Sequence, residues 1–173
     1  MNPSAAAALL SLLFFHAAQG APPSDVPENL KVPAGHELVL QAHATGSQIY
    51  VCQAGPDLAW TLKGPDANLF DAKGAAIGTH FVGPNWKHKD GSQVTGKASA
   101  SHDAPEPDSV PWLLLTATNH SGEGIFSRVA FIHRLHTKGG RPPSAQSCNE
   151  SKRGTEIKVP YSADYYFYAP ASH

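Results

Sequence analysis

Charge of either sign is scarce in this sequence, and long apolar runs are missing. Charged residues make up 16% of the 173 residues, and the formal net charge is -1. Nucleic-acid binding requires a basic stripe that neutralises phosphates, so this balance argues against a nucleic-acid partner. It also gives no reason to expect a charged membrane surface as a partner. No stretch of the chain is long and apolar enough to span a bilayer comfortably, so we expect no membrane span.

The motifs of several enzyme classes are missing as well. The sequence contains no Gly-x-Ser-x-Gly elbow, no phosphate-binding loop and no dinucleotide fingerprint. It also lacks a His-Glu-x-x-His helix and a His-x-His pair. The most closely spaced histidines, His133 and His136, would point to opposite faces of a strand, which is a poor arrangement for chelation. We therefore expect neither a metal site nor a cofactor.

The N-terminus has the pattern of an export signal. An apolar run, "AAAALLSLLFFHAA", ends in the small-residue sequence Ala18-Gln19-Gly20, which predicts a signal peptide over residues 1–20. Residues 21–30 are then expected to form a flexible leader, and residues 31–170 a single β domain. The alternative for the apolar run is a buried N-terminal helix. The expected location is secreted or periplasmic.

The chain has only two cysteines, Cys52 and Cys148. In an exported protein, two cysteines most simply form one disulfide. The bridge would attach the segment "SAQSCNESKRG" to an early strand. A catalytic cysteine is the alternative, and it is disfavoured because neither residue stands beside a glycine-rich turn or a helix start.

Alternation of apolar and polar residues dominates from His36 onward, and this period predicts half-buried strands. Turn signals separate the runs, among them Asp71-Ala72-Lys73-Gly74 and Asp90-Gly91. No convincing amphipathic helix is present. The expected fold is all-β, an antiparallel sandwich or barrel of about eight or more strands. The expected strand runs include 37–44, 47–54, 58–64, 110–119, 124–137 and a closing run over 155–170.

The stretch "GTHFVGPNWKHKDGS" carries most of the candidate chemistry. If it is one strand, and if Gly83-Pro84 does not bulge, alternate side chains fall on one face. Two imidazoles would then flank an indole, a group suited to a metal or to stacking on a sugar ring. The alternative is a set of ordinary surface and core-edge side chains. The residues of that expected face are His80, Val82, Pro84, Trp86 and His88.

Four blocks of the sequence together resemble the DUF3455 family, a group of secreted bacterial and fungal proteins of unknown function. They are "VPAGHELVLQAHATGSQIYVCQ", "WTLKGPDANLFDAKGAAIGTHFVGPNW…DGSQVTGK", "VPWLLLTATNHSGEGIFSRVAFIHRLHTKGG" and "VPYSADYYFY". The resemblance supplies no catalytic residues, but it supports the disulfide, since both cysteines fit the shared pattern. Other positions that match it are His80, Gly83, Pro84, Trp86, Asp90, Gly91, His120, Ser121, Gly122, Tyr165, Tyr166 and Tyr168.

Two functional hypotheses follow. The favoured one is a secreted, non-enzymatic β domain that binds a ligand or surface, a small molecule or a glycan, through Trp86, Tyr165 and Tyr168. The alternative is an uncharacterised hydrolase or metal-dependent enzyme, in which His80, His120 and a carboxylate such as Asp90 are the catalytic candidates. An enzyme requires polar groups that converge in a cleft, whereas a binding module does not.

Overall fold

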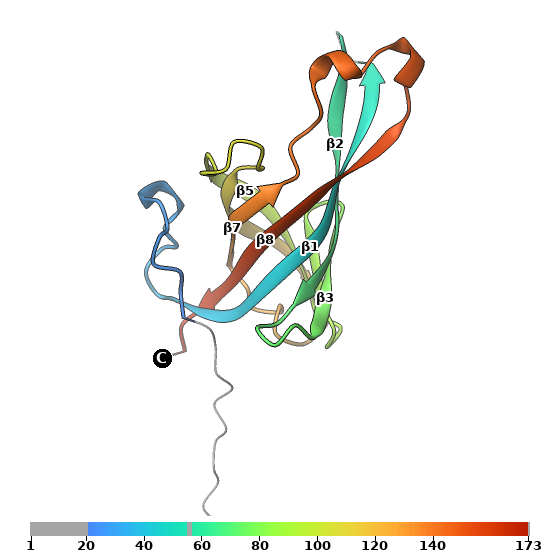
Figure 1. The fold of residues 1–173 in the computed structure, drawn as a ribbon. Helices are drawn as coiled ribbons and strands as arrows, with labels where there is room; N and C mark the ends of the chain where they lie inside the picture. Colours follow the sequence, from blue (N-terminus) through green and yellow to red (C-terminus); the bar gives the residue numbers. More distant parts are fainter. Residues whose placement is uncertain (1–20, 55–56, 173) are drawn as a thin grey trace, which may run out of the picture.

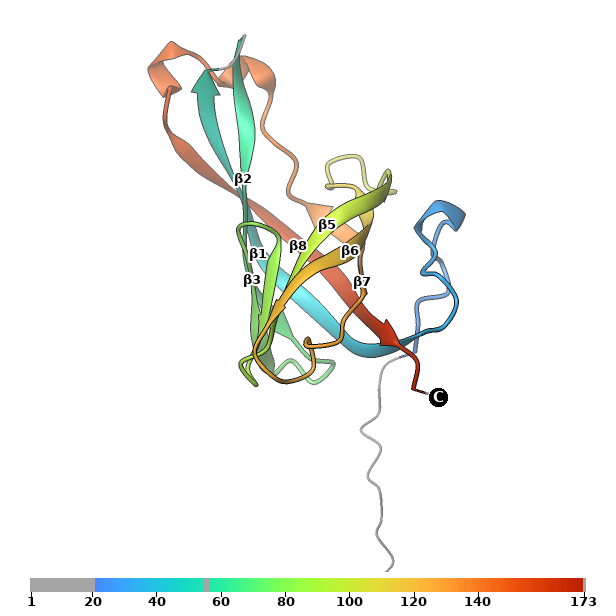
Figure 2. The ribbon, with the colours of Figure 1, turned by 180° about the vertical axis from the view of Figure 1, so that it is seen from behind.

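The computed structural model describes residues 21–54 and 57–172, and their strands form one antiparallel sheet that closes into a barrel (Figures 1 and 2). Each strand pairs with the next along the chain, and the last pairs with the first. The all-β prediction is confirmed, and the barrel is the architecture found. The predicted signal peptide lies outside the described residues. The eight strands are β1 (His36–Ala54), β2 (Leu58–Phe70), β3 (Ala76–Phe81), β4 (Asn85–His88), β5 (Gln93–His102), β6 (Trp112–Ser121), β7 (Phe131–Gly139) and β8 (Glu156–Pro170).

The inner face of the barrel holds the main core. On β1, the small side chain of Ala42 points inward opposite the large ring of Tyr165 on β8, and Ala44 pairs with another alanine, Ala163. This size difference leaves the aromatic rings room in the interior. The buried residues of this core also include Leu69, Ile77, Trp86, Val94, Leu115, Phe126, Val129 and Ile132.

A second core lies on the outside of the barrel wall. The segment that precedes β1 folds back through a short 3-10 helix, η1 (Glu28–Leu30), and buries Leu30 completely. Its neighbours are the outward side chains of β6, β7 and β8. The "WLLL" run of β6 is therefore buried on both faces, and this explains why it lacks alternation. The buried members of this outer core are Leu30, Leu38, Ala104, Trp112, Leu114, Leu135, Tyr166 and Tyr168.

The predicted hairpin turns at residues 71–74 and 90–91 are confirmed, but two predicted strands are wrong. The stretch around Gly83-Pro84 is not one strand, because these residues form the turn that separates β3 from β4. The run from Gly124 onward becomes a strand only at Phe131, because the preceding segment turns inward and buries Phe126. Both errors come from treating alternation as continuous across a turn.

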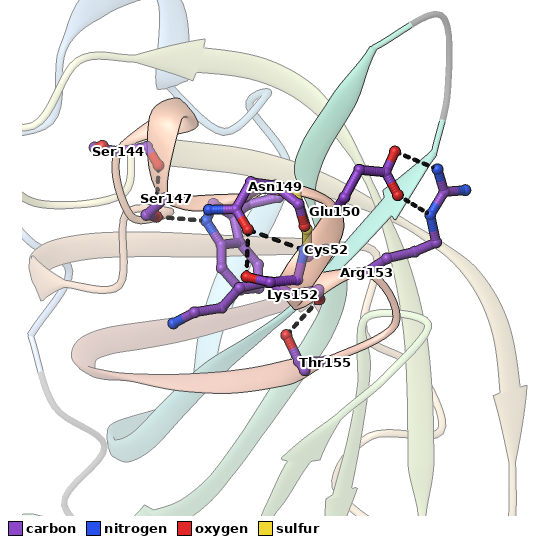
Figure 3. Close-up of a disulfide and its surroundings, with 11 residues drawn as sticks. Cys52, Ser144, Ser147, Asn149, Glu150, Lys152, Arg153 and Thr155 are labelled. Carbon is purple, nitrogen blue, oxygen red and sulfur yellow. Dashed lines mark hydrogen bonds and ion pairs between the residues drawn. A yellow bond between two sulfur atoms is a disulfide. The ribbon is translucent and has the colours of Figure 1, made fainter.

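β1, β2 and β8 continue past the barrel into a twisted extension, topped by η2 (Ala145–Ser147) and η3 (Glu150–Lys152) (Figure 1). Cys52 and Cys148 form a disulfide there, with Cα atoms 5.5 Å apart, so the predicted bridge is confirmed (Figure 3). Backbone hydrogen bonds join Cys52 to Gly154 and Thr155, and the Trp60 indole donates to Ser147 Oγ. The predicted attachment of this tail segment to an early strand is correct.

A cluster of acidic and histidine side chains attaches the N-terminal segment to the barrel. His136 Nδ1 lies 2.9 Å from Asp164 Oδ2, and its Nε2 lies 3.0 Å from Asp25 Oδ2. His43 pairs with the other oxygen of Asp164. His136 has a left-handed backbone, φ 49°, at a bulge in β7, which brings its ring against the outer-core aromatics. The expectation that His133 and His136 lie on opposite faces is therefore wrong.

Removal of the disulfide is expected to lower the free energy of unfolding strongly. The bridge closes a loop with a sequence separation of 96 residues. Loop-closure entropy then gives a loss of about 4–5 kcal/mol for the Cys52→Ala/Cys148→Ala variant. Urea unfolding followed by circular dichroism measures it, and reduced wild-type protein is the matched control. A loss below about 1 kcal/mol in both samples contradicts the expectation.

The His136 cluster predicts a pH-dependent contribution to stability. Burial lowers the pKa of His136, but its hydrogen bonds to Asp164 and Asp25 outweigh this and raise it overall. The stabilisation is therefore complete below about pH 6.5, the ordinary histidine value, and is lost as pH rises through the raised pKa.

Thermal melts of wild type and His136→Asn between pH 5 and 9 test this contribution, because asparagine tolerates the left-handed backbone but does not titrate. We expect the difference in Tm between the two proteins to shrink toward high pH. A difference that stays constant across the range contradicts the role of the histidine charge.

Candidate functional site

One end of the barrel opens into a cavity of about 370 Å³, which we call the open-end cavity. Every strand contributes to its wall, because the cavity is the part of the barrel interior that side chains do not fill. A volume of this size falls in the range of small-molecule sites, about 300–1,000 Å³. Its lining residues are Gln48, Leu62, Lys63, Gly64, Pro65, His80, Gly83, Pro84, Trp86, Ala98, Leu113, Leu115, Arg134 and Tyr165.

Two buried side chains of this lining have polar atoms without a partner. Gln48 is 1% exposed, and neither its amide oxygen nor its amide nitrogen has a hydrogen-bond partner among the described residues. The indole Nε1 of Trp86, a residue that is 1% exposed, is in the same situation. Leaving such a group unpaired costs about 1–3 kcal/mol. Two residues of the cavity lining therefore carry two donor nitrogens and one acceptor oxygen that no described protein atom satisfies.

His80 and Trp86 form the aromatic wall of the cavity. They are Cα partners across the β3–β4 hairpin, and their rings stack at 4.4 Å with an interplanar angle of 6°. Tyr165 approaches both rings edge-on. His80 Nδ1 donates a hydrogen bond to the Asn85 carbonyl at 2.9 Å. Burial lowers the pKa of His80 to about 3, so the imidazole is neutral and its Nε2 is an acceptor.

Arg134 brings a positive charge to the inner face of the barrel. It is the Cα partner of Tyr165 on one side and of Leu113 on the other, and all three line the cavity. Its Nε and Nη2 donate to the Pro111 carbonyl, at 3.1 and 2.8 Å. No carboxylate of the described residues forms an ion pair with it. The guanidinium is thus held in place by a neutral acceptor, and its charge is not compensated.

The charge of Arg134 acts on its neighbours. Burial raises the pKa of Tyr165 and of Tyr161, and the positive charge of Arg134 opposes this rise in both. In His80 the same charge adds to the effect of burial and lowers the pKa further. The cavity therefore has a positive electrostatic field, and the phenols and the imidazole that it reaches are neutral.

The rim of the cavity is apolar. The large apolar side chains that stay exposed in the described part of the chain are Leu62 and Val82. Leu62 lines the cavity directly, and Val82 lies against Gly64, which also lines it. The two exposed apolar side chains therefore lie at or beside this opening.

The residues expected to bind a ligand are divided between the two faces of the barrel wall. Trp86 and Tyr165 line the open-end cavity, whereas Tyr168 belongs to the outer core, where its hydroxyl contacts His133. A second, shallower hollow of about 690 Å³ lies beside Tyr168, beneath the N-terminal segment. Two of the three residues are therefore brought together.

The catalytic candidates do not share one site. Cα pairing places His80, Trp86, Val94 and His120 in a single row across four strands. Three strand spacings along the sheet separate the Cα atoms of the two histidines, and of the two only His80 lines the open-end cavity. His120 instead donates a hydrogen bond from Nε2 to the Val129 carbonyl at 2.7 Å.

Asp90 lies at the opposite end of the barrel, where its carboxylate holds a loop in place. Its Oδ1 accepts hydrogen bonds from the backbone and hydroxyl of Ser92, and its Oδ2 accepts from the Ile125 backbone. Although desolvation raises its pKa, these bonds lower the pKa of Asp90 well below the ordinary value. Only glycine fits at position 124, because a Cβ there would lie 2.3 Å from the carboxylate. Asp90 thus attaches the loop that places Phe126 in the core.

Gln48 and Arg134 are the cavity residues that sequence reasoning missed. Polar residues on strands are expected to face solvent, which is why both were passed over. A signal was present for Gln48, since it has the same parity as Tyr50 and Cys52, two apolar residues of one face. Arg134 likewise has the parity of the buried Ile132.

Asp90→Ala is expected to lower the free energy of unfolding by about 2–3 kcal/mol, because it leaves the Ser92 and Ile125 donors unpaired. Asp90→Asn, which keeps one acceptor oxygen, should lose less. Urea unfolding at pH 7 measures both. In wild type this contribution is present above pH 3.8 and is lost as pH falls, since the folded pKa is lowered. If the free energy of unfolding is unchanged in both variants, the structural role of Asp90 is contradicted.

The part of the chain that the structure describes has no helix of the length and apolarity needed to cross a membrane, and no group of three potential metal ligands.

Comparison with known proteins gives a match to a family model. No curated protein and no solved structure matches the chain. A family model described as "Protein of unknown function (DUF3455)" matches residues 33–169. That range runs from before β1 to Ala169 in β8, and the chain therefore belongs to the DUF3455 family.

Proposed function

We propose that this chain is an exported binding protein whose open-end cavity holds a small organic molecule. The observation that supports it is the combination of a 370 Å³ cavity at the barrel mouth with buried polar atoms that have no protein partner. Ligand sites in proteins have this composition, a mostly apolar wall with a few convergent polar groups. The mouths of small barrels are a common place for them.

The cavity favours a compact molecule with an apolar body over a glycan. Sugar rings bring many hydroxyl groups, each of which needs a hydrogen-bond partner when it is buried. The walls here are Leu62, Pro65, Leu113 and Leu115 together with the stacked rings of His80 and Trp86. Such a lining suits a flat or aliphatic surface, and the few unsatisfied polar atoms suit one polar end.

Export is supported by two independent features. Residues 1–20 have the pattern of a signal peptide, and the Cys52–Cys148 disulfide is the kind of bond that persists in oxidising compartments. A binding protein outside the cytoplasm would meet its ligand at the open end of the barrel.

A pocket-blocking variant tests the proposal. Ala98 lines the cavity but is exposed, so Ala98→Trp should fill the mouth without disturbing the core. We expect the neutral fluorescent probe N-phenyl-1-naphthylamine to bind wild type with increased emission, and to bind Ala98→Trp at least about tenfold more weakly, because the indole occupies its volume.

Ala72→Trp is the matched control, since Ala72 is exposed in the turn between β2 and β3, outside the cavity lining. Circular dichroism establishes that both variants fold. No binding to wild type, or equal binding to wild type and Ala98→Trp, contradicts the proposed site.

A further inference from the structure

We propose that the ligand of the open-end cavity is an organic carboxylate, with its anionic group held by Arg134 and its apolar or aromatic body against the His80–Trp86 wall. This inference rests on the proposed function and specifies its ligand class. It draws on the charges, the unpaired donors and the wall geometry of the cavity.

The charged residues of the cavity favour an anionic ligand. The ionic residues that line the cavity are Lys63 and Arg134, and the lining contains no aspartate or glutamate. Lys63 already pairs with Glu156. The acceptors of Arg134 are neutral, the Pro111 carbonyl and the Tyr165 hydroxyl, although a guanidinium carries five N–H donors. A partly buried cation without a counter-charge is costly, and an anionic ligand removes that cost.

The unpaired N–H groups of the cavity residues favour a ligand that only accepts hydrogen bonds. Gln48 Nε2 and Trp86 Nε1 are buried in the same lining, and both lack an acceptor. A carboxylate is an acceptor-only group with two oxygens and about four lone-pair sites. It is therefore matched to a guanidinium fork supported by neutral N–H donors, whereas an ammonium ligand would meet repulsion from Arg134.

The aromatic wall of the cavity favours a ligand with an apolar or aromatic body. His80 and Trp86 stack in parallel, and Tyr165 approaches both at ring-centroid distances of 5.0 and 5.4 Å. Tyr165 is also the Cα partner of Arg134, so the aromatic wall and the cation are neighbours on the barrel surface. An aromatic acid can therefore place its ring on the wall while its carboxylate faces Arg134.

The test uses 2-naphthoate and 2-naphthamide, two probes of nearly equal shape of which only the first is charged. Isothermal titration calorimetry at pH 7.5 gives the affinity of each. We expect wild type to prefer the carboxylate by about tenfold or more, since a charge-assisted hydrogen bond is roughly twice as strong as a neutral one. In Arg134→Met the preference should fall to near one, and Arg134→Lys, which keeps the charge but loses the fork, should be intermediate.

Gln48→Met supplies a readout that a purely structural role would not give. It removes an unsatisfied buried amide at nearly constant length, so the Tm of the free protein should stay the same or rise while the affinity for 2-naphthoate falls several-fold. Because the Arg134 variants are judged by the ratio of the two probes, and Gln48→Met by an affinity that falls without a fall in Tm, a general loss of stability does not imitate the expected result.

The two levels of the proposal fail differently. Equal affinity of both probes for wild type, with binding still abolished in Ala98→Trp, overturns the carboxylate inference and leaves the binding site in place. Binding of neither probe overturns both. A preference for 2-naphthoate that survives unchanged in Arg134→Met also overturns the assignment of Arg134.

Discussion

The pairing of the first strand with the last is the constraint on which the rest of the molecule depends. β1 and β8 are antiparallel neighbours from His36 opposite Pro170 to Val51 opposite Glu156, and this ladder closes the sheet. Closure removes the exposed edges that an open sheet would present. It also gives the barrel a single interior, so that the size of each inward side chain decides whether a given level is filled or hollow. Because the partners are so far apart in sequence, the disulfide in the extension reinforces the same non-local arrangement: it joins β1 to the segment that leads into β8.

The interior is filled unequally along the barrel. At the closed end, the Asp90 carboxylate attaches the loop that inserts Phe126, whose ring packs at 4.5 Å against Phe167. At the other end, small residues such as Gly64 and Ala98 line the cavity together with the Gly83-Pro84 turn, and they leave part of the interior unfilled. One end therefore contributes packing and the other leaves a volume lined by functional groups. The tightly packed part of the core and the candidate site therefore lie at opposite ends of the same eight strands.

Much of this architecture could be predicted, because alternation is a local property of strands. The all-β class, the hairpin at Asp90-Gly91 and the disulfide followed from residue pattern and cysteine number. The pairing of His80 with Trp86 was reached for a different reason from the one expected, since the two meet across a hairpin at Gly83-Pro84 and not along one strand. Closure, by contrast, depends on partners distant in sequence, which no local pattern encodes. The inward placement of Arg134 had one signal, its shared parity with Ile132, but a charged residue on a strand is ordinarily assigned to solvent.

The cavity residues differ from the rest of the inner core in their unpaired polar groups, although the outer core also holds one such atom, Trp112 Nε1. Elsewhere the inner face follows the usual rule, with apolar groups packed and polar groups paired, as when Thr137 donates to the Val110 carbonyl at 2.6 Å. Gln48 and Trp86 depart from that rule in one place, beside an uncompensated Arg134. An apolar residue at position 48 would avoid the cost of a buried amide, so folding alone gives no reason for glutamine there. Local departures from good packing chemistry occur chiefly at functional sites. The grouping of three such departures around one opening is therefore a stronger indication of a ligand than any of these residues taken alone.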